Sequence, residues 1–294
     1  MVTINGTDLY VETFGPSEAP PLLFIHGHGA GSYHFTHYQA ERLSQDVRLI
    51  LVDQRGVLRS TPLAPGDELD EAQLIADYEA LREHLGIDQW AILGSSAGGH
   101  YGLRYAVEHP ASISAVAFDC PLWDFDLSDR YRLPMFAELY DQSGETEKAD
   151  RCRELAALSC RITPDDRTWE LAFGLGDRFE AMFWYDVNLG AEFRRVGEDA
   201  GFPPEYWERG LSHGALMPDL YTDVTPLLGL LRQPSLLIHG IKDFAVSPPG
   251  IEAFRNDVKN GREICFERSG HFPHAEEPDR YAELVRSLVL GATP

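Results

Sequence analysis

The sequence contains no long apolar run. None of its 294 residues belongs to a stretch that approaches the roughly 20 consecutive apolar residues needed to cross a bilayer. The opening residues, MVTINGTDLYVETFG, also lack the basic start and apolar segment of a secretory signal, and they predict a strand instead. We therefore expect a cytoplasmic protein with no membrane partner.

Cysteine is also scarce. The four cysteines, Cys120, Cys152, Cys160 and Cys265, form no CxxC pair and show no metal-like spacing with histidine. They are typical of small buried side chains in a reducing compartment and do not indicate a disulfide framework. No other pattern in the sequence calls for a cofactor or a metal.

Positive charge is in deficit. Lys and Arg number 25 against 47 Asp and Glu, which gives a formal net charge of −22. Nucleic-acid binding requires clustered Lys and Arg, so this composition argues against a nucleic-acid partner. The excess of acid favours solubility, or an acidic face that attracts a cationic substrate.

Short apolar runs bounded by turn residues recur along the chain. They cover residues 22–25, 49–52, 90–93, 113–118, 236–238 and 264–266. Runs of this kind are typical of parallel strands buried on both faces. Helical spacing separates them at residues 69–85, from 97 to about 109, and at 278–290. Residues 2–4 and 8–13 predict an antiparallel hairpin across Asn5 and Gly6. The sequence therefore predicts an α/β protein with a mostly parallel sheet flanked by helices.

The alternation stops between residues 121 and 226. This segment is rich in aromatic and acidic side chains and is mostly helical by its spacing. We interpret it as a helical cap inserted into a core made of residues 1–120 and 227–294.

The stretch "GSSAGG" at residues 94–99 carries the G-x-S-x-G pattern with Ser96 at its centre. A serine at a sharp turn from strand to helix presents its hydroxyl above the sheet, and the glycines two residues away allow the backbone to crowd there. Ser95 would place Leu93 where a glycine is needed, so Ser96 is the candidate nucleophile.

A serine nucleophile needs a base and an acid that orients the base. Asp243 follows the strand at 236–238, and His271 follows a glycine after the strand at 264–266. This gives the chain order serine, acid, histidine that the architecture requires. His274 is an alternative base and Asp119 an alternative acid, whereas Asp53 is expected to bind loop amides.

The glycine-rich stretch "HGHGAG" at residues 26–31 follows the first apolar run. Together with the residue after the nucleophile, it is expected to form the oxyanion hole, from the backbone amides of His28 and Ala97. The four histidines His26, His28, His34 and His37 are read as structural hydrogen-bonding groups, with a metal site as the alternative.

These motifs together resemble the α/β-hydrolase superfamily over essentially the whole chain. The matching pieces are HGHGAG at 26–31, DQRGVLRS at 53–60, GSSAGG at 94–99, HGIKDFAVSP at 239–248 and SGHFPHAEEP at 269–278. DQRG with the nearby RS, and the YAVEHP ending of the nucleophile helix, look like the proline iminopeptidase branch. The resemblance implies removal of N-terminal residues from peptides, with acids of the cap holding the substrate's free ammonium.

The chain departs from that branch at two places beside the expected nucleophile. It reads HGHGA where the branch usually has HGGPG, and it has Ala97 where a tryptophan is usual. A smaller residue here leaves a roomier pocket that also suits an ester or a lactone.

The sequence thus predicts a serine hydrolase that cleaves a small ester, amide or short peptide through an acyl-enzyme on Ser96. Gly27, Trp123, Trp184 and Glu192 are expected to line the substrate pocket. An aminopeptidase of the proline iminopeptidase type is one form of this activity. The alternatives are a carboxylesterase or lactonase acting on a small apolar metabolite, and a non-catalytic binding protein on the same fold.

Overall fold

The computed structural model describes residues 1–64 and 66–291. Within these residues the chain forms an eight-stranded sheet with the order β1-β2-β4-β3-β5-β6-β7-β8, in which all pairs from β4 onward are parallel. The strands are β1 (Val2–Ile4), β2 (Thr7–Phe14), β3 (Pro21–Ile25), β4 (Arg48–Asp53), β5 (Trp90–Ser95), β6 (Ile113–Asp119), β7 (Ser235–Gly240) and β8 (Gly261–Phe266). The mostly parallel sheet and the antiparallel β1–β2 hairpin are confirmed.

Successive residues of the central strands enter two different cores. Leu22 and Phe24 of β3 pack on one face of the sheet, and Leu23 and Ile25 pack on the other. Because side chains alternate across a strand, an uninterrupted apolar run supplies both faces at once. This is why the predicted strands lack any alternation of apolar and polar residues.

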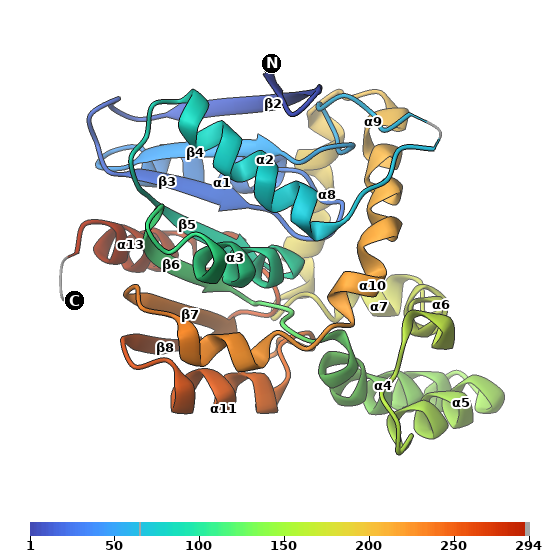
Figure 1. Ribbon diagram of the computed structural model, residues 1–294. Helices are drawn as coiled ribbons and strands as arrows, with labels where there is room; N and C mark the ends of the chain where they lie inside the picture. The colour runs from blue at the N-terminus through green and yellow to red at the C-terminus, as the bar shows by residue number, and fades with distance from the viewer. Residues whose placement is uncertain (65, 292–294) are drawn as a thin grey trace.

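Helices cover both faces of the sheet (Figure 1). The core on one face contains residues of α1 (Tyr33–Leu43) and α13 (Pro278–Val289). The other contains residues of α2 (Glu71–His84), α3 (Ala97–Glu108) and α11 (Pro248–Asp257). The Asp70 carboxylate accepts a hydrogen bond from the Gln73 amide and so caps α2 at its N-terminus.

The segment between β6 and β7 is helical and lies to the right of the sheet in Figure 1. We call residues 121–226 the helical insertion. Its helices, and the short 3-10 turns among them, are α4 (Phe125–Gln142), α5 (Thr146–Ala156), η1 (Pro164–Asp166), α6 (Thr168–Phe173), α7 (Asp177–Ala181), α8 (Val187–Asp199), α9 (Pro204–Glu208), η2 (Arg209–Leu216), α10 (Met217–Leu220) and η3 (Thr225–Leu230). The last turn, η3, crosses the boundary at residue 226 that the sequence suggested.

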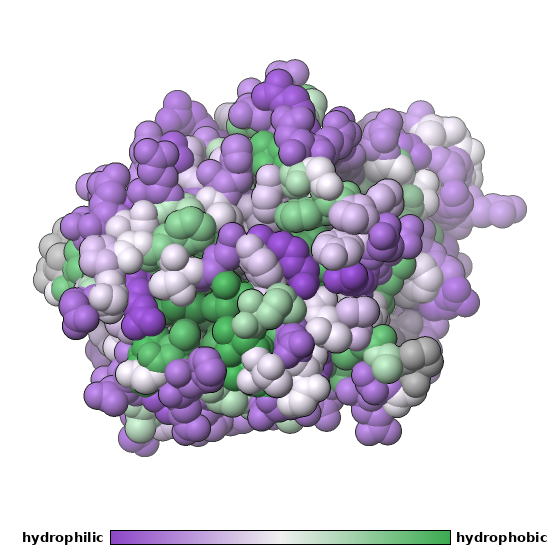
Figure 2. Space-filling model, turned by 90° about the horizontal axis from the view of Figure 1, so that it is seen from above, coloured by the Kyte–Doolittle hydropathy of each residue, from purple (hydrophilic) through white to green (hydrophobic). Residues whose placement is uncertain are grey.

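One face of the molecule shows the polar character of its surface (Figure 2). Figure 2 shows a face covered mostly by hydrophilic residues, with apolar residues gathered in a few small areas. In the part of the chain that the structure describes, no helix combines the length and the apolar character needed to span a bilayer.

Close packing of α3 on β5 depends on a glycine at position 94. A Cβ at Gly94 would lie 2.3 Å from the carbonyl oxygen of Gly98, which is a rigid backbone atom. We expect Gly94→Ala to lower the free energy of unfolding by about 3 kcal/mol or more. Gly214→Ala is the control, because nothing lies within 4 Å of its Cβ position. It should change stability by no more than about 1 kcal/mol. Urea denaturation measures both, and equal effects would contradict the close approach.

Candidate active site

Ser96 occupies the turn between β5 and α3 with a strained backbone. Its φ of 54° and ψ of −124° lie outside the regions that residues other than glycine normally adopt. Three backbone hydrogen bonds hold it there. The Ser96 amide donates to the Asp119 carbonyl at 2.9 Å, and the Ser96 carbonyl accepts from the amides of Gly99 and Leu122, each at 2.9 Å. Ser95, in contrast, is the last residue of β5 and is buried.

Glycines around Ser96 allow the loop after β3 to approach α3. A Cβ at Gly98 would lie 2.1 Å from the carbonyl oxygen of Ile25, and one at Gly27 would lie 3.0 Å from the Ser96 Cβ. The loop after β3 is therefore in backbone contact with the first turn of α3 and lies against the Ser96 side chain. This brings the expected oxyanion loop directly beside the candidate nucleophile.

Asp243 and His271 come together as the sequence predicts. Nδ1 of His271 and Oδ1 of Asp243 lie 3.0 Å apart, and both residues are buried. The same carboxylate oxygen accepts the Ala245 amide at 2.8 Å, which fixes its direction. Asp243 follows β7 and His271 follows β8, so the pair lies at the same carboxyl edge of the sheet as Ser96.

Asp53 binds the end of the loop that is expected to form the oxyanion hole. Its Oδ1 accepts the Ser32 amide and the Ser32 hydroxyl, each at 2.8 Å, and its Oδ2 pairs with Arg59 Nε at 2.6 Å. Burial raises the pKa of Asp53, but the hydrogen bonds and charge of Arg59 outweigh it and hold the pKa below its usual value. The DQRGVLRS motif therefore supports the loop, in agreement with the role expected for Asp53.

His26 is buried, His28 and His34 are half-buried and His37 is exposed, and among residues 1–64 and 66–291 they form no group that could hold a metal ion. Burial lowers the pKa of His26, His28 and His34 to about 4. The His26 ring accepts the Gln54 amide at 3.0 Å, and the His34 ring stacks on Phe193 of α8 at 3.9 Å between centroids. Contacts of this kind match the structural role that the sequence favoured over a metal site.

His213 of η2 is a histidine of the same region that sequence reasoning missed. Its ring centroid lies 6.0 Å from that of His28 and 6.2 Å from that of His26, and burial also lowers its pKa to about 4. Only the path of the helical insertion brings residue 213 to this loop. No local motif marks it.

The two alternatives for the base and the acid pair with each other. His274 Nδ1 and Asp119 Oδ2 lie 3.0 Å apart, and both residues are buried. Asp119 also supplies the carbonyl that holds the Ser96 amide. A second His–Asp pair therefore lies beside the first, and it braces the turn that carries the serine.

Cys120 completes a group with the first pair. The Cys120 sulfur, a carboxylate oxygen of Asp243 and a ring nitrogen of His271 lie within 4.8 Å of one another, and no other such cluster of metal-ligating groups occurs among residues 1–64 and 66–291. Metal ligation would require a thiolate. Burial, with the nearby carboxylates of Asp243 and Asp119, raises the pKa of the Cys120 thiol well above its ordinary value. Without a metal ion, Cys120 is therefore a neutral thiol beside a hydrogen-bonded His–Asp pair.

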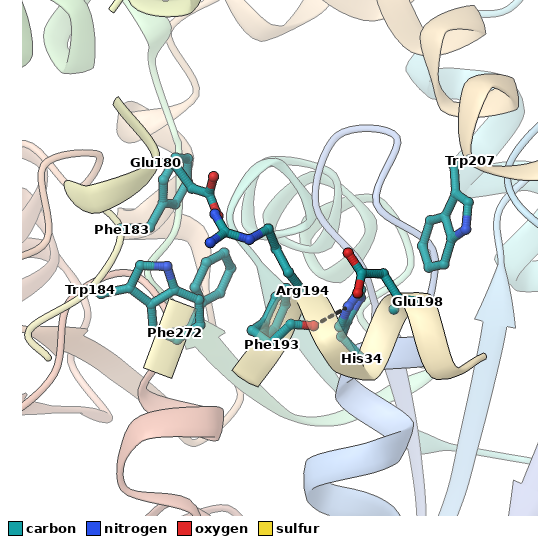
Figure 3. Close-up of a pocket in the computed structure, with 10 residues that line it drawn as sticks. His34, Glu180, Phe183, Trp184, Phe193, Arg194, Glu198, Trp207 and Phe272 are labelled. Carbon is teal, nitrogen blue, oxygen red and sulfur yellow. Dashed lines mark hydrogen bonds and ion pairs between the residues drawn. The ribbon is translucent and has the colours of Figure 1, made fainter. Parts of the chain in front are cut away.

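A cavity of about 440 Å³ lies between the helical insertion and the core (Figure 3). We call it the aromatic cavity. Its lining residues are His34, Glu180, Phe183, Trp184, Phe193, Arg194, Gly197, Glu198, Trp207 and Phe272. Ser96, Asp243 and His271 are not among them. Phe183 and Phe272 connect it to the His–Asp pair, because their ring centroids lie 5.5 and 5.3 Å from that of His271.

The four residues expected in the pocket lie in different places. Gly27 is beside Ser96, and Trp184 lines the aromatic cavity. Glu192 lines a second, smaller cavity together with Arg42 and other residues. Trp123 is buried against Phe254 with parallel rings 6.0 Å apart, and it lines neither cavity.

Comparisons with known proteins agree with the fold. A family model described as alpha/beta hydrolase fold matches residues 20–161. The chain is 31% identical over 201 residues to the proline iminopeptidase of Xanthomonas citri, a match that covers 65% of this chain and 60% of that protein. It is 38% identical over 115 residues to a probable proline iminopeptidase of Streptomyces coelicolor, covering 37% of this chain and 35% of that protein. The matched stretches thus leave out a large part of these relatives.

A third curated relative matches along the whole chain. The bifunctional esterase/perhydrolase of Acinetobacter calcoaceticus is 26% identical over 307 residues, covering 99% of this chain and 98% of that protein.

Two solved structures have the same fold. A proline iminopeptidase-related protein from Thermus thermophilus superposes with a TM-score of 0.73 at 22% identity, over 100% of this chain and 97% of that one. A meta-cleavage product hydrolase from Pseudomonas fluorescens gives a TM-score of 0.71 at 19% identity, over 99% and 97%.

Four histidines whose pKa is lowered in the folded state predict that the protein loses stability in mild acid. His26, His28, His34 and His213 have folded pKa values of about 4, below the value of about 6.5 for an unfolded histidine. The unfolded chain therefore binds protons first, and the free energy of unfolding falls as the pH drops from about 6.5 toward 4. Each histidine contributes a slope of up to about 1.4 kcal/mol per pH unit.

Urea denaturation between pH 7 and 4.5 measures this slope. His213→Gln removes one titrating group while a side-chain amide can still bond the Arg55 carbonyl, which His213 contacts at 3.0 Å. The variant should show a shallower slope than the unsubstituted protein. Equal slopes would contradict the assignment.

Proposed function

We propose that this chain, which matches the α/β-hydrolase family model and shares the fold, is a serine hydrolase that cleaves a carboxylic ester or amide through an acyl-enzyme on Ser96. The observation that carries the proposal is the strained turn at Ser96, at the same edge of the sheet as the buried Asp243–His271 pair. Strain of this kind is typical of functional residues, and a buried His–Asp pair is the usual partner of a serine nucleophile.

Each residue then has a role in the reaction. His271 takes the proton of the Ser96 hydroxyl as the oxygen attacks the substrate carbonyl. Asp243, bonded to Nδ1, holds His271 in the tautomer that leaves Nε2 as the base and stabilises the imidazolium that forms. His271 next gives the proton to the departing alcohol or amine, and water hydrolyses the acyl-serine by the same route in reverse.

The backbone amides of His28 and Ala97 are proposed to bind the oxyanion. The first amides of a helix have no acceptor within the helix, and Ala97 is the first residue of α3. The close approach of Gly27 to Ser96 supports a second donor from the following residue, His28.

The aromatic cavity supports an apolar, planar leaving group. The general acid must lie beside the leaving group, and the cavity adjoins His271 through Phe183 and Phe272. Its volume of about 440 Å³ is within the range of small-molecule sites. Aryl esters and anilides therefore fit better than small alkyl esters.

An aminopeptidase is the second candidate. The curated relatives named as proline iminopeptidases favour it. An aminopeptidase of this kind also needs a carboxylate that meets the substrate's ammonium. Glu180 at the aromatic cavity is paired with Arg194, whereas Glu198 lines the same cavity beside His34 (Figure 3). Glu198 is therefore the carboxylate best placed for this role, ahead of Glu192, which lines the other cavity.

Removal of the nucleophile tests the assignment of Ser96. Ser96→Ala and His271→Ala should each lower kcat on 1-naphthyl acetate by about 10,000-fold or more, because the members of a triad act as a unit. Ser95→Ala is the matched control and should keep most of the activity. A serine-directed fluorophosphonate should label the unsubstituted chain and the Ser95 variant but not Ser96→Ala. An unlabelled, inactive wild-type chain would favour a binding protein on this fold.

Three substrates separate an esterase from an aminopeptidase. The three substrates are an aryl ester, an alanyl or prolyl anilide with a free amine, and the N-acetylated form of the same anilide. We expect the protein to hydrolyse the aryl ester. If a carboxylate binds the ammonium, blocking the amine should lower kcat/KM of the anilide by about tenfold to 100-fold, because a hydrogen bond to a charged group contributes about 1.5–3 kcal/mol. Equal rates on the two anilides would rule out the aminopeptidase.

A further inference from the structure

One short stretch of the helical insertion runs directly along the loop that carries His271. The carbonyl of Phe183 accepts the backbone amide of His271 at 2.7 Å. A Cβ at Gly270 would lie 2.3 Å from the same carbonyl oxygen, so the two backbones touch. We call residues 183–186 the strap. Two of its residues, Phe183 and Trp184, also line the aromatic cavity.

A single carboxylate joins the strap to the loop that carries His271, which we call the base loop. Oε1 of Glu276 accepts the amides of Tyr185 at 2.7 Å and Asp186 at 3.3 Å, and Oε2 accepts the amide of Gly270 at 2.5 Å. Both oxygens of the carboxylate are therefore used, one for each side of the contact. Charged acceptors of this kind form the stronger hydrogen bonds in proteins.

The strap also reaches the loop that carries the acid. Lys242, the residue before Asp243, donates to the Tyr185 carbonyl at 3.4 Å, and its ammonium lies 4.2 Å from the centre of the Tyr185 ring. The lining of the cavity and the two loops of the His–Asp pair are thus linked through four consecutive residues.

We propose that Glu276 is a positioning residue, which fixes the position of the aromatic cavity relative to His271. The inference rests on the proposed hydrolase function. A leaving group seated against Phe183 and Trp184 is held by the strap. The loop of His271, which must protonate that group, is bonded to the Glu276 carboxylate through the amide of Gly270, and the strap is bonded to the same carboxylate. Glu276 itself touches neither the substrate nor the reacting atoms.

The chain offers a matched control at the next residue. Glu277 has the same side chain, but it accepts hydrogen bonds from the Arg268 amide at 3.1 Å and the Ser269 hydroxyl at 3.0 Å. Both of these partners lie outside the helical insertion. Among residues 1–64 and 66–291, the hydrogen bonds and ion pairs of its side chain go to Arg268, Ser269 and Arg280, and none reaches the strap. Glu277→Gln therefore reports on the loop alone, and Glu276→Gln reports on the link to the insertion.

Two esters of the same acid reveal the effect on catalysis. 1-Naphthyl acetate has a planar leaving group that fills the cavity, whereas ethyl acetate does not reach it. A glutamine at position 276 keeps one acceptor oxygen. Its NH₂ group then faces either the Gly270 amide or the amides of the strap, which are also donors, so the hydrogen-bonded link between the strap and the base loop is broken. We expect Glu276→Gln to lower kcat/KM on the naphthyl ester by about tenfold to 100-fold, as small displacements of reacting groups do.

The ethyl ester should fall by no more than about threefold, because Asp243 still orients His271 in this variant. Glu277→Gln should leave the ratio of the two esters unchanged. A proportional fall on both esters in Glu276→Gln would mean that Glu276 only supports the loop, and it would overturn the proposal.

Hydrogen exchange tests the link without any hydrolysis. In Glu276→Gln, the amides of Gly270, Tyr185 and Asp186 should exchange at least about tenfold faster than in the unsubstituted chain, and Glu277→Gln should leave them unchanged. Faster exchange in a chain that hydrolyses neither ester would show that the proposed function fails while the link stands. Unchanged exchange in Glu276→Gln would overturn the link itself.

Discussion

The strained backbone at Ser96 is the constraint on which the rest of the site depends. A residue with a side chain is held at a φ of 54° only because surrounding groups fix it from several sides. The Asp119 carbonyl and the Leu122 amide bind it from β6 and from the residues just after β6, and α3 begins immediately after it. Its position between Gly27 and Gly98 then requires backbones that approach without side chains. The two central cores of the sheet are what hold these strands and this helix at such short distances.

Buried polar groups stabilise the surroundings of this turn. Asp53 bonds Ser32 and Arg59, and His274 pairs with Asp119, the residue whose carbonyl holds the serine. Groups of this kind are costly to bury unless they are bonded, so each one specifies a particular arrangement of its loop. The neutral histidines near residues 26–34 follow the same logic. Because burial lowers their pKa values, the stability of the folded state depends on these histidines remaining uncharged.

The helical insertion contributes to the site through a few backbone contacts with the core. The strap at residues 183–186 contacts the base loop and supplies two walls of the aromatic cavity. Gly210 of η2 meets Gly29 of the oxyanion loop backbone to backbone. A substrate seated under the insertion is therefore surrounded by segments that are also in contact with the residues expected to react with it.

The strands, the central helices and the candidate site residues can all be predicted from local patterns. An apolar run bounded by glycine, a serine flanked by glycines and an acid or histidine just after a strand are each visible within a few residues, because the chemistry requires those types at those positions. Helix α11 lacks such a clear pattern, and the sequence did not predict it. The pairing of His274 with Asp119, the approach of His213 to His28 and the bridge made by Glu276 join residues that are about 90 or more positions apart. The first of these contacts follows from the packing of the core around the sheet, and the other two follow from how the insertion folds back on it, so no short motif encodes them.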